Sequence, residues 1–331
     1  MFVSYYGTGT VGTKSKQTFT FDFDTGSSDT FIPGPNCQGC YGTTKYNQQG
    51  VDEHNTTTVT YGSGQVSGEN YLDSVTVAGL TATNQNVISL TQATGFDGPN
   101  NALMGMAFQS IANSDSTPFF FNLIKQGKVN PTEFSFYLGR AKSGTQGRSE
   151  MTLGGRDRSR YTGAFTNVPV TSQTYWQTAI DGASVGGKPV NITSGQSAID
   201  TGTTLVLAPN VAAAAIFAQI PGAVPIPGLG GVATLYAYPC NSKPNVALTY
   251  AGKSFAINNL DFNFGTLSDG LGLPVLSGTN YCLAGLGGAD IDPGTPLWIV
   301  GDVFLKNWYS TFHYTNPSSA YVAFAKAAGN Q

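Results

Sequence analysis

The tripeptide Asp-Thr-Gly occurs twice in this chain, at Asp24-Thr25-Gly26 and again at Asp200-Thr201-Gly202. Each copy follows an apolar, strand-like run, so each places a carboxylate on a turn at the end of a strand. The glycine permits close backbone approach, and the threonine hydroxyl can donate and accept hydrogen bonds. Either copy alone is a short motif that chance supplies often; the pair predicts two similar halves that each contribute one carboxylate.

The repeat extends beyond the tripeptide. An apolar pair followed by glycine comes after the first copy as Leu103-Met104-Gly105 and after the second as Ile299-Val300-Gly301. Each half therefore predicts a strand that bears the aspartate and, later, an apolar strand that ends at a glycine. Two similar lobes are the simplest account of this duplication.

Further motifs fall in one characteristic order along nearly the whole chain. They are Tyr5-Tyr6-Gly7, Val11-Gly12-Thr13, Tyr61-Gly62-Ser63-Gly64, Phe96-Asp97-Gly98, Leu153-Gly154-Gly155, Tyr175-Trp176 and Trp298-Ile299-Val300-Gly301-Asp302. With both Asp-Thr-Gly copies, this order resembles that of the pepsin-like aspartic proteases, and secreted fungal members most of all. The resemblance implies an all-β chain with a few short helices, two lobes related by pseudo-twofold symmetry, and an active-site cleft between them.

Composition and length agree with that fold. A chain of 331 residues can bury the cores of two domains, and 42 glycines with 17 prolines suit short strands joined by turns. Helical signals are clearest at 118–126 and 209–219, where proline begins each segment and, in the second, alanines follow.

The resemblance places the inter-lobe connection near the charged, hairpin-like stretch 156–162. We therefore expect an N-terminal lobe at 1–158 and a C-terminal lobe at 159–331. The Gly/Ser-rich segment 143–149 has the composition of a hairpin loop and need not mark a boundary.

The paired aspartates suggest acid–base chemistry. Hydrolysis of an amide by water needs one group to take a proton from the water and another to polarise the carbonyl. Two carboxyl groups that share one proton can act as this acid and this base, as they do in the catalytic dyad of aspartic proteases. We expect Asp24 to act as the acid and Asp200 as the base in the first step.

The resemblance also assigns roles to the neighbours of the two aspartates. The threonines would link the two active-site loops through their hydroxyls, the glycines would let backbone amides reach the carboxylates, and the next residues would bind the outer carboxylate oxygens. These supporting residues are Thr25, Gly26, Ser27, Thr201, Gly202 and Thr203.

The segment Tyr61-Gly62-Ser63-Gly64 lies between two strand-like runs, which predicts the tip of a β-hairpin. In the family this hairpin is the flap that closes over the substrate, so Tyr61, Gly62 and Ser63 are expected to bind substrate, with Phe96 in the wall of the S1 pocket. Phe31 stands where the family usually has tryptophan, so an indole-to-tyrosine hydrogen bond is not expected here.

Asp22 precedes the catalytic position by two residues. Alternation along a strand directs residues 22 and 24 to one side, so the Asp22 carboxylate is expected to face the same cleft. There it would permit lysine before the cut bond, beside a general preference for large apolar residues. A solvated carboxylate at the strand end is the alternative.

The four cysteines, Cys37, Cys40, Cys240 and Cys282, permit three pairings. The resemblance selects Cys37 with Cys40 and Cys240 with Cys282, whereas Cys37-Gln38-Gly39-Cys40 alone could be a redox pair or half a zinc site. Disulfides imply an oxidising compartment, and the triplets that begin at Asn55 and Asn191 are candidate glycosylation sites.

Charge and hydropathy limit the partners. With 16 basic against 19 acidic residues there is no electrostatic footprint for nucleic acid, and no apolar run is long enough to cross a membrane. We expect a monomer without metal or cofactor that binds polypeptide substrates and pepstatin-type inhibitors. It would be secreted, or alternatively vacuolar, and a mature form derived from a zymogen.

Two other functions need to be considered. A catalytically silent member of the fold would bind proteins without cutting them, but both aspartates, both glycines and Tyr61 are intact. A glycosidase with two carboxylates would need a saccharide cleft lined by exposed tryptophan, and the chain has only three tryptophans. Both readings are less well supported than an acid endopeptidase, and the site, not the fold, separates them.

Overall fold

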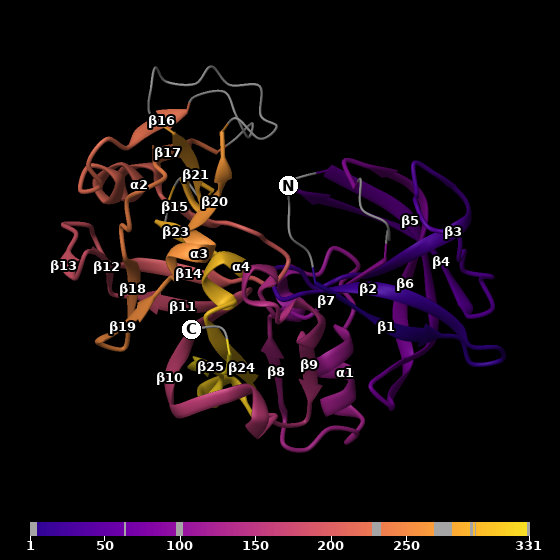
Figure 1. Ribbon diagram of the computed structural model, residues 1–331. Helices are drawn as coiled ribbons and strands as arrows, with labels where there is room; N and C mark the ends of the chain where they lie inside the picture. Colours follow the sequence, from indigo (N-terminus) through magenta and orange to yellow (C-terminus); the bar gives the residue numbers. More distant parts are fainter. Residues whose placement is uncertain are drawn as a thin grey trace.

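The structure is a computed structural model of the chain, and it describes residues 5–62, 64–96, 102–226, 233–267, 280–291, 294 and 296–329. Figure 1 shows two lobes, with the N-terminal strands on the right, the strands of the C-terminal half on the left, and a layer formed by β8, β9, β10, β24 and β25 below and between them. The fold is mainly β with short helices, as the resemblance implied.

The N-terminal lobe is one sheet. Its strand order is β1-β2-β7-β3-β6-β5-β4, and β1 also pairs with β5. The bounds are β1 Tyr6–Val11, β2 Gln17–Asp24, β3 Thr30–Gln38, β4 Val51–Tyr61, β5 Gly64–Val77, β6 Leu80–Thr94 and β7 Ala102–Gly105. In β2 every second residue is an apolar ring, and Phe19, Phe21 and Phe23 are all buried, as a strand covered on one face requires.

A longer sheet joins the connecting layer to the C-terminal lobe. Its order is β22-β15-β23-β14-β11-β10-β25-β24-β8-β9. The bounds are β8 Glu133–Tyr137, β9 Glu150–Leu153, β10 Tyr161–Gln173, β11 Trp176–Ile180, β14 Gly195–Ile199, β15 Val206–Ala208, β22 Leu286–Gly288, β23 Leu297–Val300, β24 Trp308–His313 and β25 Tyr321–Ala327. Strand β10 pairs with β25 over its first part and with β11 near its end, so it carries the sheet from the shared layer into the lobe.

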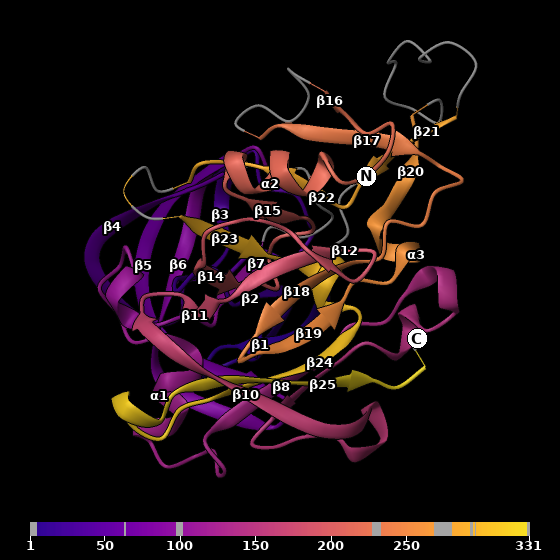
Figure 2. The ribbon, with the colours of Figure 1, turned by 90° about the vertical axis from the view of Figure 1, so that its left-hand side faces the viewer.

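Two small sheets complete the C-terminal lobe, in the orders β13-β12-β18-β19 and β16-β17-β21-β20. Their strands are β12 Gly182–Val185, β13 Lys188–Pro189, β16 Val224–Ile226, β17 Leu235–Pro239, β18 Val246–Tyr250, β19 Lys253–Ala256, β20 Asn263–Thr266 and β21 Tyr281–Ala284. Figure 2, turned by a quarter from the first view, shows β18 and β19 lying close to β24 and β25.

The described helices are short. They are α1 Phe119–Lys125, α2 Asn210–Phe217, α3 Asn259–Phe262 and α4 Asp302–Leu305, with 3₁₀ turns at η1 Gln109–Ile111, η2 Ala141–Ser143, η3 Gln146–Arg148, η4 Arg158–Arg160 and η5 Pro317–Ser319. The expected helices at 118–126 and 209–219 are confirmed, and Pro118 and Pro209 directly precede them.

The connections differ in one respect from expectation. The segment 143–149 does join the antiparallel strands β8 and β9, as a hairpin loop should. The stretch 156–162, in contrast, is not a hairpin: it contains η4 and then enters β10. The division into lobes at residue 158 stays a prediction.

An aromatic cluster ties the halves together. The indole nitrogen of Trp176, at the start of β11, donates to the carbonyl oxygen of Met106 at 2.9 Å. Its ring lies 4.8 Å from that of Phe108 and 5.3 Å from that of Phe312, measured between centroids. Residues from both ends of the chain therefore share one buried core beneath the strands that carry the aspartates.

Candidate active site

The two aspartates occupy equivalent positions in the two lobes. Asp24 ends β2, which pairs in parallel with β7 so that Asp24 lies opposite Gly105. Asp200 directly follows β14, which pairs in parallel with β23, and its backbone nitrogen donates to the carbonyl oxygen of Val300 at 3.1 Å. The predicted repeat of an aspartate strand beside an apolar strand is confirmed in both halves.

Each aspartate lies against the glycine of the other loop. A Cβ atom added to Gly202 would meet Asp24 Oδ1 at 2.3 Å, and one added to Gly26 would meet the carboxyl carbon of Asp200 at 2.5 Å. Contacts that short are impossible, so only glycine fits at either place. The two carboxyl groups, far apart in sequence, therefore share one small space.

Backbone and hydroxyl donors hold each carboxyl group in the same way. The Gly26 nitrogen donates to Asp24 Oδ1 at 2.7 Å and the Gly202 nitrogen to Asp200 Oδ1 at 2.8 Å. The other oxygens accept from hydroxyls, Asp24 Oδ2 from Ser27 at 2.5 Å and Asp200 Oδ2 from Thr203 at 2.7 Å. This matched set fixes both side chains in place, with the supporting residues arranged as the resemblance implied.

The threonines cross from one loop to the other. Thr25 Oγ1 donates to the carbonyl oxygen of Ile199 at 2.7 Å and accepts from the Thr201 nitrogen at 3.0 Å. Thr201 Oγ1 donates to the carbonyl oxygen of Phe23 at 2.5 Å and accepts from the Thr25 nitrogen at 3.0 Å. Because all these groups are buried, separation of the two loops would leave buried polar atoms without hydrogen-bond partners.

The environment of Asp24 disfavours its charged form. Burial raises the pKa of Asp24 well above its usual range, and the nearby Asp200 charge raises it further, while the Ser27 hydroxyl partly opposes the shift. Two close carboxyls cannot both ionise cheaply. One of them can therefore donate a hydrogen bond while the other accepts, which is the arrangement that acid–base hydrolysis requires.

Asp302 is a buried acid near the pair to which the sequence reasoning gave no role. It begins α4, and its backbone nitrogen donates to the carbonyl oxygen of Thr203 at 2.8 Å. Among the described residues neither of its carboxyl oxygens has a hydrogen-bond partner. Burial raises its pKa well above the usual range, Lys306 opposes this, and the three other acids near the site add to it. The one sequence feature that could have drawn attention to Asp302 is its position directly after Gly301, at the end of the apolar strand.

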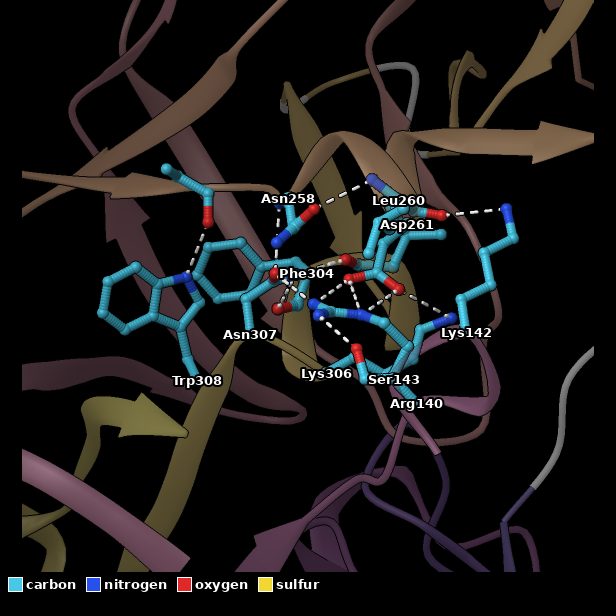
Figure 3. A network of polar contacts seen from close by, with 12 residues as sticks. Arg140, Lys142, Ser143, Asn258, Leu260, Asp261, Phe304, Lys306, Asn307 and Trp308 are labelled. Carbon is cyan, nitrogen blue, oxygen red and sulfur yellow. Dashed lines mark hydrogen bonds and ion pairs between the residues drawn. The ribbon is translucent and has the colours of Figure 1, made fainter. Parts of the chain in front are cut away.

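An ionic network holds the far end of α4 (Figure 3). The Arg140 guanidinium donates to both carboxyl oxygens of Asp261 and, at 2.8 Å, to Asn307 Oδ1. Lys306 Nζ lies 3.5 Å from Asp261 Oδ1. Arg140 comes from the segment after β8 and Asp261 from α3, so this network fastens the connecting layer to the helix that supports the Asp200 loop.

Asp22 lies on β2, two residues before Asp24. The residue is half-buried, and its Oδ1 atom is buried without a hydrogen-bond partner among the described residues. Burial, with a further contribution from the Asp200 charge, raises the pKa of Asp22 to about 7. The carboxyl group is therefore not the solvated strand end of the alternative reading.

The hairpin of β4 and β5 brings Tyr61 to the site. The strands pair up to Tyr61 opposite Gly64, and a Cβ atom on Gly62 would meet nothing within 4 Å, so this tip is open. Burial raises the pKa of Tyr61 above its usual range, and the negative charge of Asp24 adds to this shift. Ser63 lies outside the described residues.

Three rings form the wall behind this hairpin. Tyr61 packs edge-to-face on Phe96 at 5.2 Å and on Phe31 at 6.1 Å, and Phe31 packs on Phe96 at 5.7 Å. The Tyr61 hydroxyl is buried, and no hydrogen bond of normal geometry reaches it from the described residues. The absence of an indole partner, expected from Phe31, is thus a feature of the site, and ring packing positions Tyr61 instead.

The remaining sequence expectations concern disulfides and sequons. The structure joins Cys37 to Cys40 and Cys240 to Cys282, the pairing that the resemblance selected. Cysteines bonded in this way are not zinc ligands. No cluster of metal-binding side chains occurs in the described part of the chain. No described helix is long and apolar enough to cross a membrane. Asn55 lies on β4 and Asn191 between β13 and β14.

Fold and site together show two similar halves, each of which contributes one buried carboxyl group to a shared pair. A family model described as eukaryotic aspartyl protease matches residues 4–327. An aspartic protease of Phaffia rhodozyma is 38% identical over 94% of this chain and 74% of its own length. Cathepsin D of Dictyostelium discoideum is 34% identical over 98% of this chain and 83% of its own, and pepsin A of Rhinolophus ferrumequinum is 33% identical over 96% and 80%. The chain belongs to the eukaryotic aspartyl protease family and is a pepsin-like aspartic endopeptidase.

Proposed function

We propose that Asp24 and Asp200 are the catalytic pair that hydrolyses internal peptide bonds of extended polypeptides at acid pH. The observation that carries this proposal is the mutual approach of the two loops, in which each carboxyl lies against the other loop's glycine. Matched donors hold both side chains. A lone turn aspartate would have neither feature.

In the proposed mechanism a water molecule lies between the two carboxyl groups. Asp200 takes a proton from the water as its oxygen attacks the peptide carbonyl carbon, and Asp24 gives its proton to the carbonyl oxygen. The tetrahedral intermediate collapses when the C–N bond breaks and a proton passes to the leaving nitrogen. The raised pKa of Asp24 supports its assignment as the initial acid.

The hairpin tip would close over the bound peptide. Gly62 and Ser63 would supply backbone hydrogen bonds, while Tyr61 and Phe96 would form an apolar wall for the side chain before the cut bond. The edge-to-face packing of Tyr61, Phe31 and Phe96 supports this wall. It favours large apolar residues there.

Asp22 would add tolerance of lysine at the same position. Its buried, unpartnered oxygen near the pair can accept a hydrogen bond from an ammonium group. A charged hydrogen bond of this kind contributes about 1.5–3 kcal/mol when water is excluded. The bound lysine would then supply the hydrogen bond that the buried Asp22 Oδ1 atom lacks.

We further propose a monomeric enzyme with lobes 1–158 and 159–331 that works without metal or cofactor in a secreted or vacuolar compartment and binds no nucleic acid or membrane. The two disulfides fit an oxidising compartment. Asn191 and Asn55 are the candidate glycosylation sites.

The test of the catalytic pair is digestion of an unfolded protein over pH from about 2 to 7, with the products sequenced. Activity should be acidic, indifferent to chelators and blocked by pepstatin. Asp24→Asn and Asp200→Asn should each lose nearly all turnover, whereas Asp115→Asn, an exposed acid, should not. Wild-type turnover in either dyad variant would refute the assignment, and a folded but inactive wild type would favour the silent binding protein.

The test of Asp22 compares peptides with lysine or norleucine before the cut bond. A bound lysine ammonium favours the ionised form of Asp22, which asparagine does not have. In Asp22→Asn the ratio of kcat/KM for lysine over norleucine should therefore fall about tenfold. An unchanged ratio would show that Asp22 takes no part in specificity.

A further inference from the structure

A cavity in the C-terminal half is lined by residues other than those of the active site. Its volume is about 290 Å³, close to the lower end of the range for small-molecule pockets, about 300–1,000 Å³. It is lined by residues of β10, β19, β24 and β25: Thr162, Gly163, Ala164, Thr166, Lys253, Ser254, Phe255, Trp308, Phe324, Ala325 and Lys326. None of them belongs to the site described above.

The opening results from an irregularity in β10. The register of β10 on β25 runs from Thr162 opposite Lys326 directly to Thr166 opposite Phe324, so the intervening residues bulge out of the sheet. Gly163 has a positive φ of 75°, which glycine adopts readily, and a Cβ atom there would meet nothing within 4 Å. The bulge leaves a hollow between β10 and β19, which lie near each other in both ribbon views (Figures 1 and 2).

The floor of the cavity is aromatic and firmly held. Phe255 packs edge-to-face on Trp308 at 4.8 Å and on Phe324 at 5.5 Å. The Trp308 indole nitrogen donates to the carbonyl oxygen of Ala256 at 3.0 Å, which fixes the ring (Figure 3). A floor of this kind binds an apolar side chain without rearrangement.

The rim carries two ammonium groups. Lys326 lies directly opposite Trp308 on β24 and opposite Thr162 on β10, so it stands in the middle of the sheet face that forms one wall. Lys253 reaches over from β19, with its Nζ atom 3.2 Å from Thr166 Oγ1. No acidic residue lines the cavity, and neither lysine forms an ion pair with any described residue.

An apolar floor with uncompensated cations at its rim matches one ligand chemistry: an apolar side chain next to a carboxylate. We propose that this cavity binds the C-terminal apolar residue of a peptide, with its side chain on Trp308 and its α-carboxylate between Lys253 and Lys326. An inorganic anion would not use the aromatic floor, and a neutral apolar molecule would not use the lysines.

If the proposed function is correct, the ligands of this cavity include products of the enzyme itself. An endopeptidase that cuts after large apolar residues creates new chain ends of this chemistry, so the cavity would retain its own products. Binding at the cavity itself needs no turnover, and the experiment below separates the two.

The test is a ligand titration of the whole protein, carried out once with pepstatin bound and once without it. Trp176 and Trp298 are buried and Trp308 is half-exposed, so a change in tryptophan emission reports chiefly on this cavity. N-acetyl-L-phenylalanine titrated at pH 5 should change the emission saturably, and calorimetry should give the same Kd. N-acetyl-L-phenylalaninamide, which differs only in its neutral end, should bind about tenfold more weakly.

Variants locate the site. Lys326→Gln and Lys253→Gln should each weaken binding of the acid about fivefold and leave binding of the amide unchanged, because each removes one cation from a partly solvated rim. Lys188→Gln, an exposed lysine on β13, should have no effect. Binding should also weaken as the pH falls through the carboxyl pKa of the ligand, about 3.5.

Three results would overturn the proposal: equal affinity for acid and amide, unchanged binding in both lysine variants, or competition by phosphate at an affinity equal to that of the acid. Proteolytic activity of the lysine variants should equal that of wild type. If the enzyme proves inactive but the titration behaves as described, the cavity assignment stands and only its link to products is lost.

Discussion

Replacing Thr25 by valine should destabilise the protein far more than the same replacement at Thr30. Both threonines are buried in the N-terminal lobe, and the substitution changes each by one hydroxyl. The hydroxyl of Thr25 makes two bonds to the other lobe, whereas that of Thr30 has no hydrogen-bond partner among the described residues. The comparison therefore isolates the bonds that join the lobes.

The magnitude follows from the groups left behind. Without the Thr25 hydroxyl, the carbonyl oxygen of Ile199 and the nitrogen of Thr201 lose their partner in a buried place. Each stranded group costs about 1–3 kcal/mol, and the added methyl returns about 0.8 kcal/mol. We expect a loss of about 1–5 kcal/mol in the free energy of unfolding. Thr30→Val, which strands nothing, should be neutral or slightly stabilising.

The pseudo-symmetry of the site gives a second check. Thr201 makes the same two bonds in the reverse direction, to the carbonyl oxygen of Phe23 and from the nitrogen of Thr25. Thr201→Val should therefore cost the same as Thr25→Val.

The assay is urea unfolding followed by tryptophan fluorescence, at a pH where the protein does not digest itself. The midpoints should shift with little change in slope, since the surface exposed on unfolding stays the same. The reasoning is refuted if Thr25→Val unfolds at the same urea concentration as Thr30→Val, or if only one of the two cross-lobe threonines matters.

Three other predictions concern acids, the hairpin and the buried ion pair. Because the pKa of Asp22 is about 7 in the folded protein and near 4 in the unfolded chain, the free energy of unfolding should fall as pH rises between these values. Asp22→Asn should remove about 4 kcal/mol of that fall, measured by urea unfolding, with Asp115→Asn as the matched variant at an exposed site. Tyr61→Ala should lower kcat/KM and weaken discrimination before the cut bond in peptide assays, whereas Tyr61→Phe should keep the stability of wild type within about 0.5 kcal/mol, since its hydroxyl has no hydrogen bond of normal geometry. Arg140→Met should cost about 3–5 kcal/mol by leaving the Asp261 charge without its main partner, and adding Asp261→Leu should recover most of the loss; a double variant no better than the single one in thermal unfolding would contradict this.

Much of the site could be predicted because its parts are local in sequence. An aspartate, a threonine and a glycine in a row carry their own turn geometry, so the duplication alone predicted a pair of carboxyls held by nearby donors. The helices at Phe119–Lys125 and Asn210–Phe217 were likewise marked by a preceding proline. Signals of this kind are local, so they can be read without knowledge of the tertiary contacts.

What escaped prediction depends on contacts between distant segments. Arg140 and Asp261 are separated by 121 residues, and nothing near either one indicates that it will be buried with the other. Helix α4 is a single turn, too short for a periodic signal, and it forms because its first amides bond to the Asp200 loop. The burial of Asp302 follows from that packing, so the upward shift of its pKa is a property of the assembled lobes and has no counterpart in the local sequence.

The crossed arrangement of the two loops also governs when activity can first appear. A chain that has folded only its first lobe presents Asp24 beside no second carboxyl and with the partners of Thr25 missing. Strand β15, which follows Asp200, pairs with β23 near the end of the sequence. The loop that carries Asp200 accepts hydrogen bonds from the first backbone amides of α4. If the proposed pair is catalytic, a nascent or half-folded molecule is unable to cut other chains, and activity arises only when the fold is complete.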